Sequence, residues 1–113
     1  MSPFERIGET IATYRRHGWQ LRRVLLRPET RAELAGADAA TLADAAVEEA
    51  EVDALWFARP SHAGREAWEL RLVAETPYAL FETFEADEAD EDREEVRREM
   101  QARLREHVSR ARD

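Results

Sequence analysis

The first stretch of the chain carries apolar residues at helical spacing. They recur every three or four residues and so share one helix face: Phe4, Ile7, Ile11 and Tyr14. Ser2 is a favourable N-cap residue, and the proline that follows it suits the first helical turn. Gly18 can adopt the left-handed conformation that ends a helix. The pattern predicts a helix over residues 3–17 and a strand over residues 19–27.

The segment after this strand has a weaker pattern. Thr30 and Glu33 form a capping-box pair, which predicts a short helix over residues 28–36. The alanine-rich residues 39–50 favour another helix, because Leu42, Ala46 and Val47 then share a face. An irregular crossover is the alternative for this second segment.

A two-residue period dominates the next third of the chain. Every second residue from position 68 to 74 is apolar, and most of the residues between them are charged. The apolar residues are Trp68, Leu70, Leu72 and Ala74. An apolar run over residues 55–58 precedes them, and a further strand-like run covers residues 78–84. Turn-forming residues separate the three runs, so residues 54–85 are predicted to form an antiparallel meander.

The final segment returns to helical spacing from Asp90 onward. Its apolar residues form one narrow stripe: Val96, Met100, Leu104 and Val108. Such a stripe needs a cover, which is either the chain's own sheet or a second copy of the helix. We predict this stripe as an interaction surface.

These elements predict a single α+β domain over residues 1–113. Its order is helix, strand, an optional helix, three strands and helix. We expect a four-stranded, mainly antiparallel sheet, with the first and last helices packed on one face and the middle helical segment crossing an edge.

Composition narrows the chemistry. The chain has 113 residues, a net charge of −8 and no cysteine, which excludes disulfides, thiolate nucleophiles, zinc fingers and iron–sulfur clusters. All 17 basic residues are arginine, so no P-loop or Schiff-base lysine is present. The absence of lysine and asparagine fits a GC-rich gene and favours a bacterial, cytoplasmic protein. No apolar run is long enough to cross a bilayer, and no secretory signal stands at the amino terminus.

The charges alternate along the chain. Residues 1–28 carry six arginines against two glutamates, with Trp19 among them. A nucleic-acid patch there is an alternative, but the acidic overall balance argues against a nucleic-acid partner. Residues 85–95 hold eight carboxylates and one arginine without EF-hand spacing, so they are expected to complement a helix start rather than bind a cation. The three histidines form no metal-binding pattern, and no metal or other cofactor is predicted.

The loop around residues 59–66 is the candidate ligand site. Arg59 and Arg65 could clamp an anionic group, and Ser61 with His62 could act as nucleophile and base. Aromatic residues on neighbouring predicted strands could line a pocket or form the core: Trp56, Trp68, Tyr78 and Phe81. Adjacent residues such as Ser61 and His62 rarely face each other, which argues against catalysis.

Three functional classes follow. The sequence favours a non-catalytic interaction domain that pairs with a copy of itself, as a homodimer, or with another bacterial protein. The alternative is a module that binds a small anionic ligand through the loop and the aromatic residues. The third class is a hydrolase or isomerase that uses His62 with Ser61 or Glu66.

Overall fold

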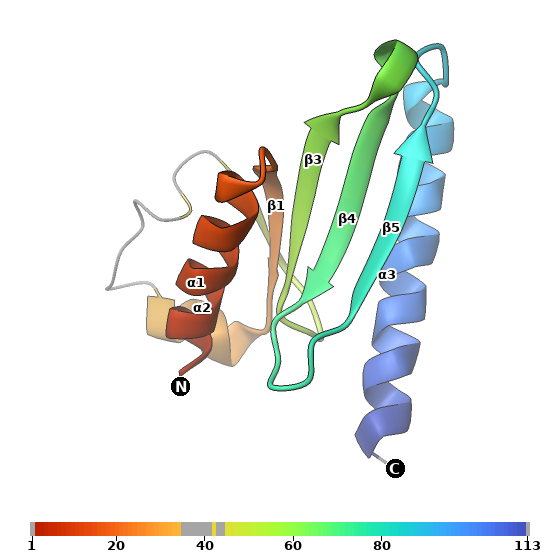
Figure 1. The fold of residues 1–113 in the computed structure, drawn as a ribbon. Coiled ribbons are helices and arrows are strands. Elements are labelled where there is room, and N and C mark those ends of the chain that lie inside the picture. Colours follow the sequence, from red (N-terminus) through yellow and green to blue (C-terminus); the bar gives the residue numbers. More distant parts are fainter. Residues whose placement is uncertain (1, 35–41, 43–44, 113) are drawn as a thin grey trace.

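The computed structural model describes residues 2–34, 42 and 45–112, which contain three α-helices and five strands. Figure 1 shows their arrangement. In chain order the elements are α1 (Pro3–Arg16), β1 (Gln20–Leu26), α2 (Pro28–Leu34), β2 (Ala46–Glu49), β3 (Ala54–Pro60), a short 3-10 turn (His62–Gly64), β4 (Glu66–Leu72), β5 (Ala79–Phe84) and α3 (Asp90–Arg112). The α+β class and the terminal helices are as predicted. None of the helices in these residues is long and apolar enough to span a membrane.

Local signals set the limits of α1. The Ser2 hydroxyl accepts a hydrogen bond from the Glu5 N–H at 3.2 Å, so serine caps the helix as predicted. Gly18 follows the helix with φ of +84°, a conformation that glycine adopts without steric cost. The helix therefore begins and ends where the sequence indicated.

The sheet has one more strand than predicted. Its order is β2-β1-β3-β4-β5, with β2 parallel to β1 and all other neighbours antiparallel. The prediction of a helix over residues 39–50 is wrong for its second half, because residues 46–49 form β2. Residues 39–41 and 43–44 lie outside the described residues. Pairing with β1, in which Val47 lies opposite Val24, outweighs the weak helical preference of the alanines.

The predicted capping box in the second helix is also wrong. α2 begins at Pro28, so Thr30 lies inside the helix and not at its cap. Its buried hydroxyl donates a hydrogen bond to the Asp53 carboxylate at 2.7 Å, and the backbone N–H of Arg27 donates to the same carboxylate at 2.8 Å. Asp53 thus joins the start of α2 to the loop before β3.

The two terminal helices lie on opposite faces of the sheet, which corrects the prediction that they share one face (Figure 1). Strand β1 shows the physical reason, because Val24 and Leu26 point to one face and Leu25 to the other, and all three are buried. A strand that is apolar on both faces needs cover on both. We call the two faces the α1 side and the α3 side.

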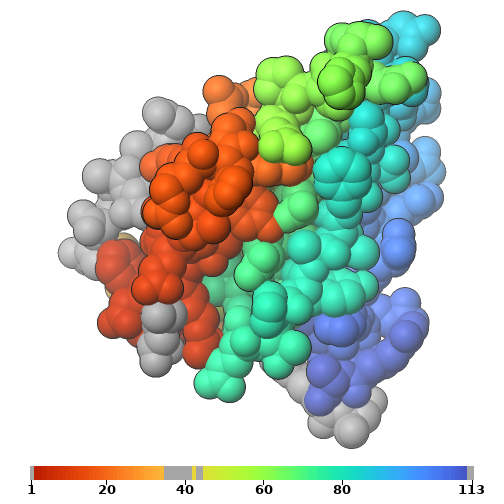
Figure 2. Space-filling view, in the orientation of Figure 1, coloured from red at the N-terminus to blue at the C-terminus, as the bar shows by residue number. Residues whose placement is uncertain are grey.

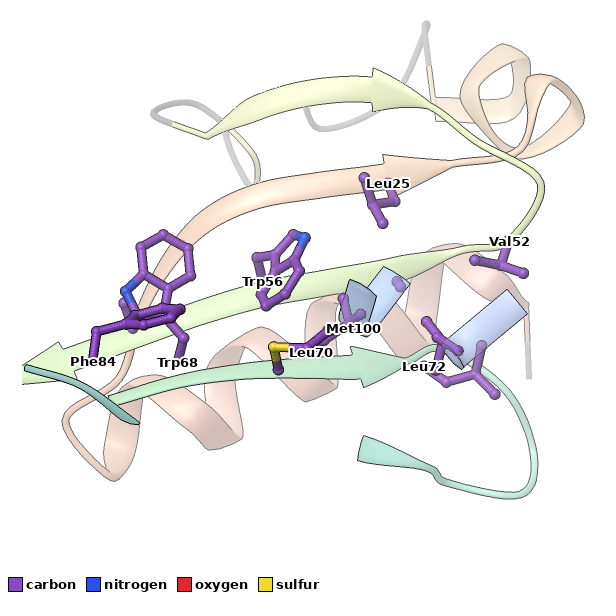
Figure 3. Packing of buried hydrophobic residues seen from close by; sticks show 11 residues of the cluster. Leu25, Val52, Trp56, Trp68, Leu70, Leu72, Phe84 and Met100 are labelled. Atoms are coloured by element: carbon purple, nitrogen blue, oxygen red, sulfur yellow. The ribbon is translucent and has the colours of Figure 1, made fainter. Parts of the chain in front are cut away.

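The α3 side holds the larger core (Figure 3). Trp56 and Leu70 from neighbouring strands pack there with Phe84 from β5, and all three are buried. Met100 and Leu104 of α3 pack against these sheet residues and cover the core. On the α1 side, Ile7 and Ile11 pack on β1 and β3 in a second core.

Candidate interaction surface

The predicted aromatic residues divide between core and surface. Trp56 and Trp68 are buried on the α3 side, with ring centroids 5.8 Å apart. The Trp56 indole N–H donates to Gln101 of α3 at 3.0 Å, and the Arg97 guanidinium lies over the Trp68 ring at 4.3 Å. Both tryptophans therefore anchor α3 to the sheet.

Tyr78 lies before β5, away from this pair in the fold. Its ring stacks on the imidazole of His107 near the end of α3, with centroids 3.6 Å apart and an interplanar angle of 9°. This contact joins the carboxyl-terminal half of α3 to the sheet.

The hairpin loop directs its two arginines to different neighbours. Arg59 lies 4.5 Å from the centre of the Trp19 ring and donates to the backbone carbonyl of His17 at 3.2 Å. Arg65 pairs with Glu85 at 2.9 Å. Each guanidinium thus binds a different group of the chain itself, so an anion clamp formed by the two arginines stays a prediction that would require these contacts to change.

The remaining residues of the loop are exposed. Ser61 and His62 belong to the described part of the chain, and no hydrogen bond joins their side chains there. The backbone bonds of Ser61 N–H to the Arg65 carbonyl and of Arg65 N–H to the His62 carbonyl close a tight turn. Gly64 adopts φ of +74° in this turn, where an added Cβ would come within 3.1 Å of Ala86. The loop is built as a turn, and within the part of the chain that the structure describes no side chain forms a hydrogen bond or ion pair with the His62 imidazole.

The apolar stripe of α3 lies on the sheet. Met100 and Leu104 are buried, and Val96 and Val108 are partly buried against the same core. Of the two covers that the sequence left open, the stripe uses the chain's own sheet. The part of α3 available to another molecule is therefore charged.

The amino-terminal half of α3 is held by ion pairs. Glu94 accepts two hydrogen bonds from Arg23 of β1, at 2.8 and 2.9 Å, and two from the buried Arg97, at 3.1 and 3.3 Å. These bonds, those from Arg23 first, lower the pKa of Glu94 to about 2. The carboxylate is thus fixed in its charged form at neutral pH.

The α1 side is covered over β1 and β3 but only in part over β4 and β5: Ala67 of β4 is buried in the second core, and the Trp19 ring meets the Phe81 ring edge-on, with centroids 6.4 Å apart. Figure 2 shows atoms of β4 and β5, coloured green to cyan, uncovered between α1 and α3. We call this uncovered area the open half, and strand register assigns five residues to it: Glu69, Arg71, Ala79, Phe81 and Thr83. Phe81 is 58% exposed, and it is the large hydrophobic side chain that stands out as exposed among the described residues.

A polar group borders the open half beside α1. The Tyr14 ring stacks on Phe57 at 4.1 Å, and its hydroxyl donates to the Glu69 carboxylate and accepts from Arg71 at 3.4 Å. Burial, and then the hydrogen bond to Glu69, raise the pKa of Tyr14 to about 12. The tyrosine therefore stays neutral and holds the edge of the covered area in place.

Strand β5 forms one edge of the sheet. Leu72 N–H donates to the Tyr78 carbonyl, so Tyr78 and every second residue after it direct their backbone groups to β4. The alternation leaves the N–H and C=O groups of Ala79, Phe81 and Thr83 on the outer edge. The Glu82 side chain accepts from the Thr83 N–H at 3.1 Å. The open half thus carries an exposed aromatic ring next to backbone groups that can bind another strand.

The sequence grouped Phe81 with the aromatic residues of a pocket or core and not with an exposed edge, because its run, residues 78–84, is apolar on both faces. That pattern is typical of a strand buried on both sides, and no local signal marks β5 as an edge. Among the described residues, no group of three or more histidine or carboxylate side chains is placed to hold a metal ion. Comparisons with protein-family models, curated proteins and solved structures found no match to this chain.

Proposed function

We propose that the protein is a non-catalytic interaction domain of the bacterial cytoplasm that works as a homo-oligomer through the open half and the β5 edge. One observation carries the proposal: Phe81 is 58% exposed on an edge strand, beside a sheet face that α1 leaves uncovered. Exposed apolar area beside an unpaired strand edge is typical of a protein-binding surface.

The charged residues of the chain support binding rather than catalysis. The hairpin arginines, Glu94 and Asp53 are each paired within the fold. Such pairs hold loops and helices in place, whereas a catalytic group needs an acid, base or nucleophile directed at a substrate. The proposal therefore rests on surface shape and apolar exposure.

The test is the self-association of the purified full chain by sedimentation velocity over a range of concentrations. We expect the wild type to form a dimer or a larger closed assembly. Phe81→Ser should weaken association about tenfold or more, because an aromatic anchor in an interface often supplies that share of the affinity. Ala102→Ser, an exposed change on α3, is the matched control and should leave association unchanged.

Two results would overturn the proposal. One is a wild-type chain that stays monomeric at every concentration. The other is a Phe81→Ser chain that associates as tightly as the wild type while its circular dichroism spectrum shows an intact fold.

A further inference from the structure

The β5 edge permits few registers with a second copy. Antiparallel pairing of two outer edges must join outward-facing residues, so a twofold axis can lie at residue 80, 81 or 82. An axis at Leu80 places Thr83 opposite Pro77, which has no N–H to donate. An axis at Glu82 places two like charges directly opposite each other.

An axis at Phe81 avoids both problems. It pairs Phe81 with Phe81 of the second copy, and Ala79 with Thr83 of the second copy. Glu82 then lies opposite Leu80 of the second copy. The whole of β5 joins the ladder, and the two aromatic rings meet on the open halves, where they can pack against each other.

The same axis passes the middle of α3. Tyr78 stacks on His107, and Phe84 lies under Arg93 and Arg97, with the Arg97 guanidinium 5.4 Å from the Phe84 ring centre. Phe81 is midway between Tyr78 and Phe84, so it lies level with about residue 101, the midpoint of α3. The two copies of α3 would therefore run antiparallel and centred on each other.

The charges of α3 are arranged for such a partner. With 100° per residue, five exposed residues share one helix stripe: Asp92, Glu99, Arg103, Glu106 and Arg110. This stripe lies on the opposite side of the helix from Glu94 and Gln101, which reach β1 and β3, so it flanks the β5 edge. In the described part of the chain, Asp92, Glu99 and Arg103 form no ion pair, and Arg110 pairs with Glu106 of its own helix.

A twofold axis at residue 101 places opposite charges opposite each other. Glu99 comes level with Arg103 of the second copy, and Asp92 with Arg110 of the second copy. Strands in a sheet are about 4.8 Å apart. Because α3 packs against β4 and β5, as Figure 1 shows, the two helices would be about 10 Å apart, a normal packing distance.

We infer that the occupant of the β5 edge is a second copy of this chain, paired antiparallel about Phe81, with the acidic half of each α3 stripe against the basic half of the other. This inference rests on the proposed function and gives it a register. The joined sheet would have the β5 edge of each copy covered, which removes the unpaired strand groups from solvent.

The absence of cysteine allows a direct test of the register. In the variant Ala79→Cys/Thr83→Cys, the thiol at position 79 of one copy faces the thiol at position 83 of the other. The two Cα atoms are then about 5.5 Å apart, a separation that a disulfide can span. Within one chain the two positions are about 13 Å apart and cannot join. We expect a covalent dimer on mild oxidation of the double variant, and none from either single variant.

The helix contact has a separate test in solution. Glu99→Arg or Arg103→Glu alone should weaken dimerisation about tenfold, because each brings like charges together twice. The combined variant Glu99→Arg/Arg103→Glu restores opposite charges and should recover the wild-type affinity. Arg98→Glu, an exposed change on the other side of α3, is the control and should have little effect.

The outcomes separate the inference from the proposed function. A wild-type dimer with no covalent dimer from the double cysteine variant would overturn the inference and leave the proposed function standing. Failure of the combined charge variant to recover affinity would also overturn the helix pairing. A monomeric wild type would overturn both.

Discussion

The two sides of the sheet differ in how far a helix covers them. On the α3 side a helix of 23 residues crosses the long strands, and Trp56 of the sheet is buried against Met100 and Leu104 of the helix. On the α1 side a helix of 14 residues covers β1 and β3 and leaves Phe81 exposed on β5. The α3 side of the sheet is therefore all core. The α1 side is core over β1 and β3 and carries the proposed binding surface over β4 and β5.

Polar groups mark this difference. On the α3 side, Arg97 lies over buried aromatic rings of the sheet, and Arg23 of β1 holds the helix through Glu94. On the α1 side, Tyr14 lies where the area covered by α1 meets the open half, and its hydroxyl donates a hydrogen bond to Glu69 there. The comparison indicates that both faces contribute a buried core, the α3 side the larger one, while the open half remains available for contact with another molecule.

The largest expected effect compares Leu104 with Phe81. Leu104→Ala removes a fully buried side chain and should lower the free energy of unfolding by about 3 kcal/mol. Phe81→Ala should lower it by about 1 kcal/mol or less, because 58% of that side chain is already in water and the loss is mainly its edge-on contact with Trp19. Urea unfolding at a concentration low enough for the chains to be monomeric measures both. Equal losses at the two positions would contradict the comparison.

A smaller effect is expected at Glu94, which holds α3 to β1. Glu94→Gln should cost about 1 kcal/mol at neutral pH, since the side chain is 37% exposed and water screens part of the interaction. Because the folded-state pKa is about 2, below the ordinary value of 4.5, the stabilisation is present above pH 4.5 and is lost as the pH falls towards 2. Between pH 4.5 and 2, the free energy of unfolding should fall less steeply in Glu94→Gln than in the wild type.

Glu95→Gln is the matched control for this experiment. Glu95 lies exposed on the same helix turn, and in the described residues it forms no ion pair. The control should follow the wild-type acid dependence. If Glu95→Gln lowered the free energy of unfolding as much as Glu94→Gln, the effect would come from the net charge of α3 and not from the contact with Arg23.

The smallest expected effect is at Tyr14 on the α1 side. The Tyr14 hydroxyl should ionise with a pKa of about 12, above its ordinary value of 10. Its contribution to stability is therefore complete below pH 10 and is lost as the pH rises through 12. Tyr14→Phe should remove this dependence and cost about 0.5 kcal/mol. Ultraviolet titration of tyrosinate provides the measurement.

The variant Glu69→Gln sharpens the Tyr14 prediction. It keeps the size of the side chain but removes the negative charge beside the hydroxyl, so the pKa of Tyr14 should fall towards 10. An unchanged titration would show that burial alone sets this pKa.

Local structure was predictable where one signal dominated. The Ser2 cap and Gly18 set the ends of α1, and the two-residue alternation around Trp68 identified β4. β2 was not predictable, because its alanine and glutamate residues favour a helix and only the backbone of β1 provides a strand partner. Local propensity is worth little beside such pairing.

The site was less predictable than the fold. The sequence grouped Arg59 and Arg65 as one anion clamp because they are close along the chain, yet each binds a different neighbour in the fold. Nothing near Phe81 in the sequence shows that β5 is an edge strand or that α1 stops short of it. Exposure depends on the positions of distant elements, and these do not follow from period or propensity.

The sequence by itself determined the types of most elements, the exclusion of cysteine and lysine chemistry, and the change from acidic to basic residues along the last helix. The tertiary structure alone decided that the terminal helices take opposite faces, that the stripe of Met100 and Leu104 is covered, and that Phe81 stays exposed. The physical reason is that periodicity records which residues must be buried, whereas the choice of partner depends on which distant surfaces compete to bury them.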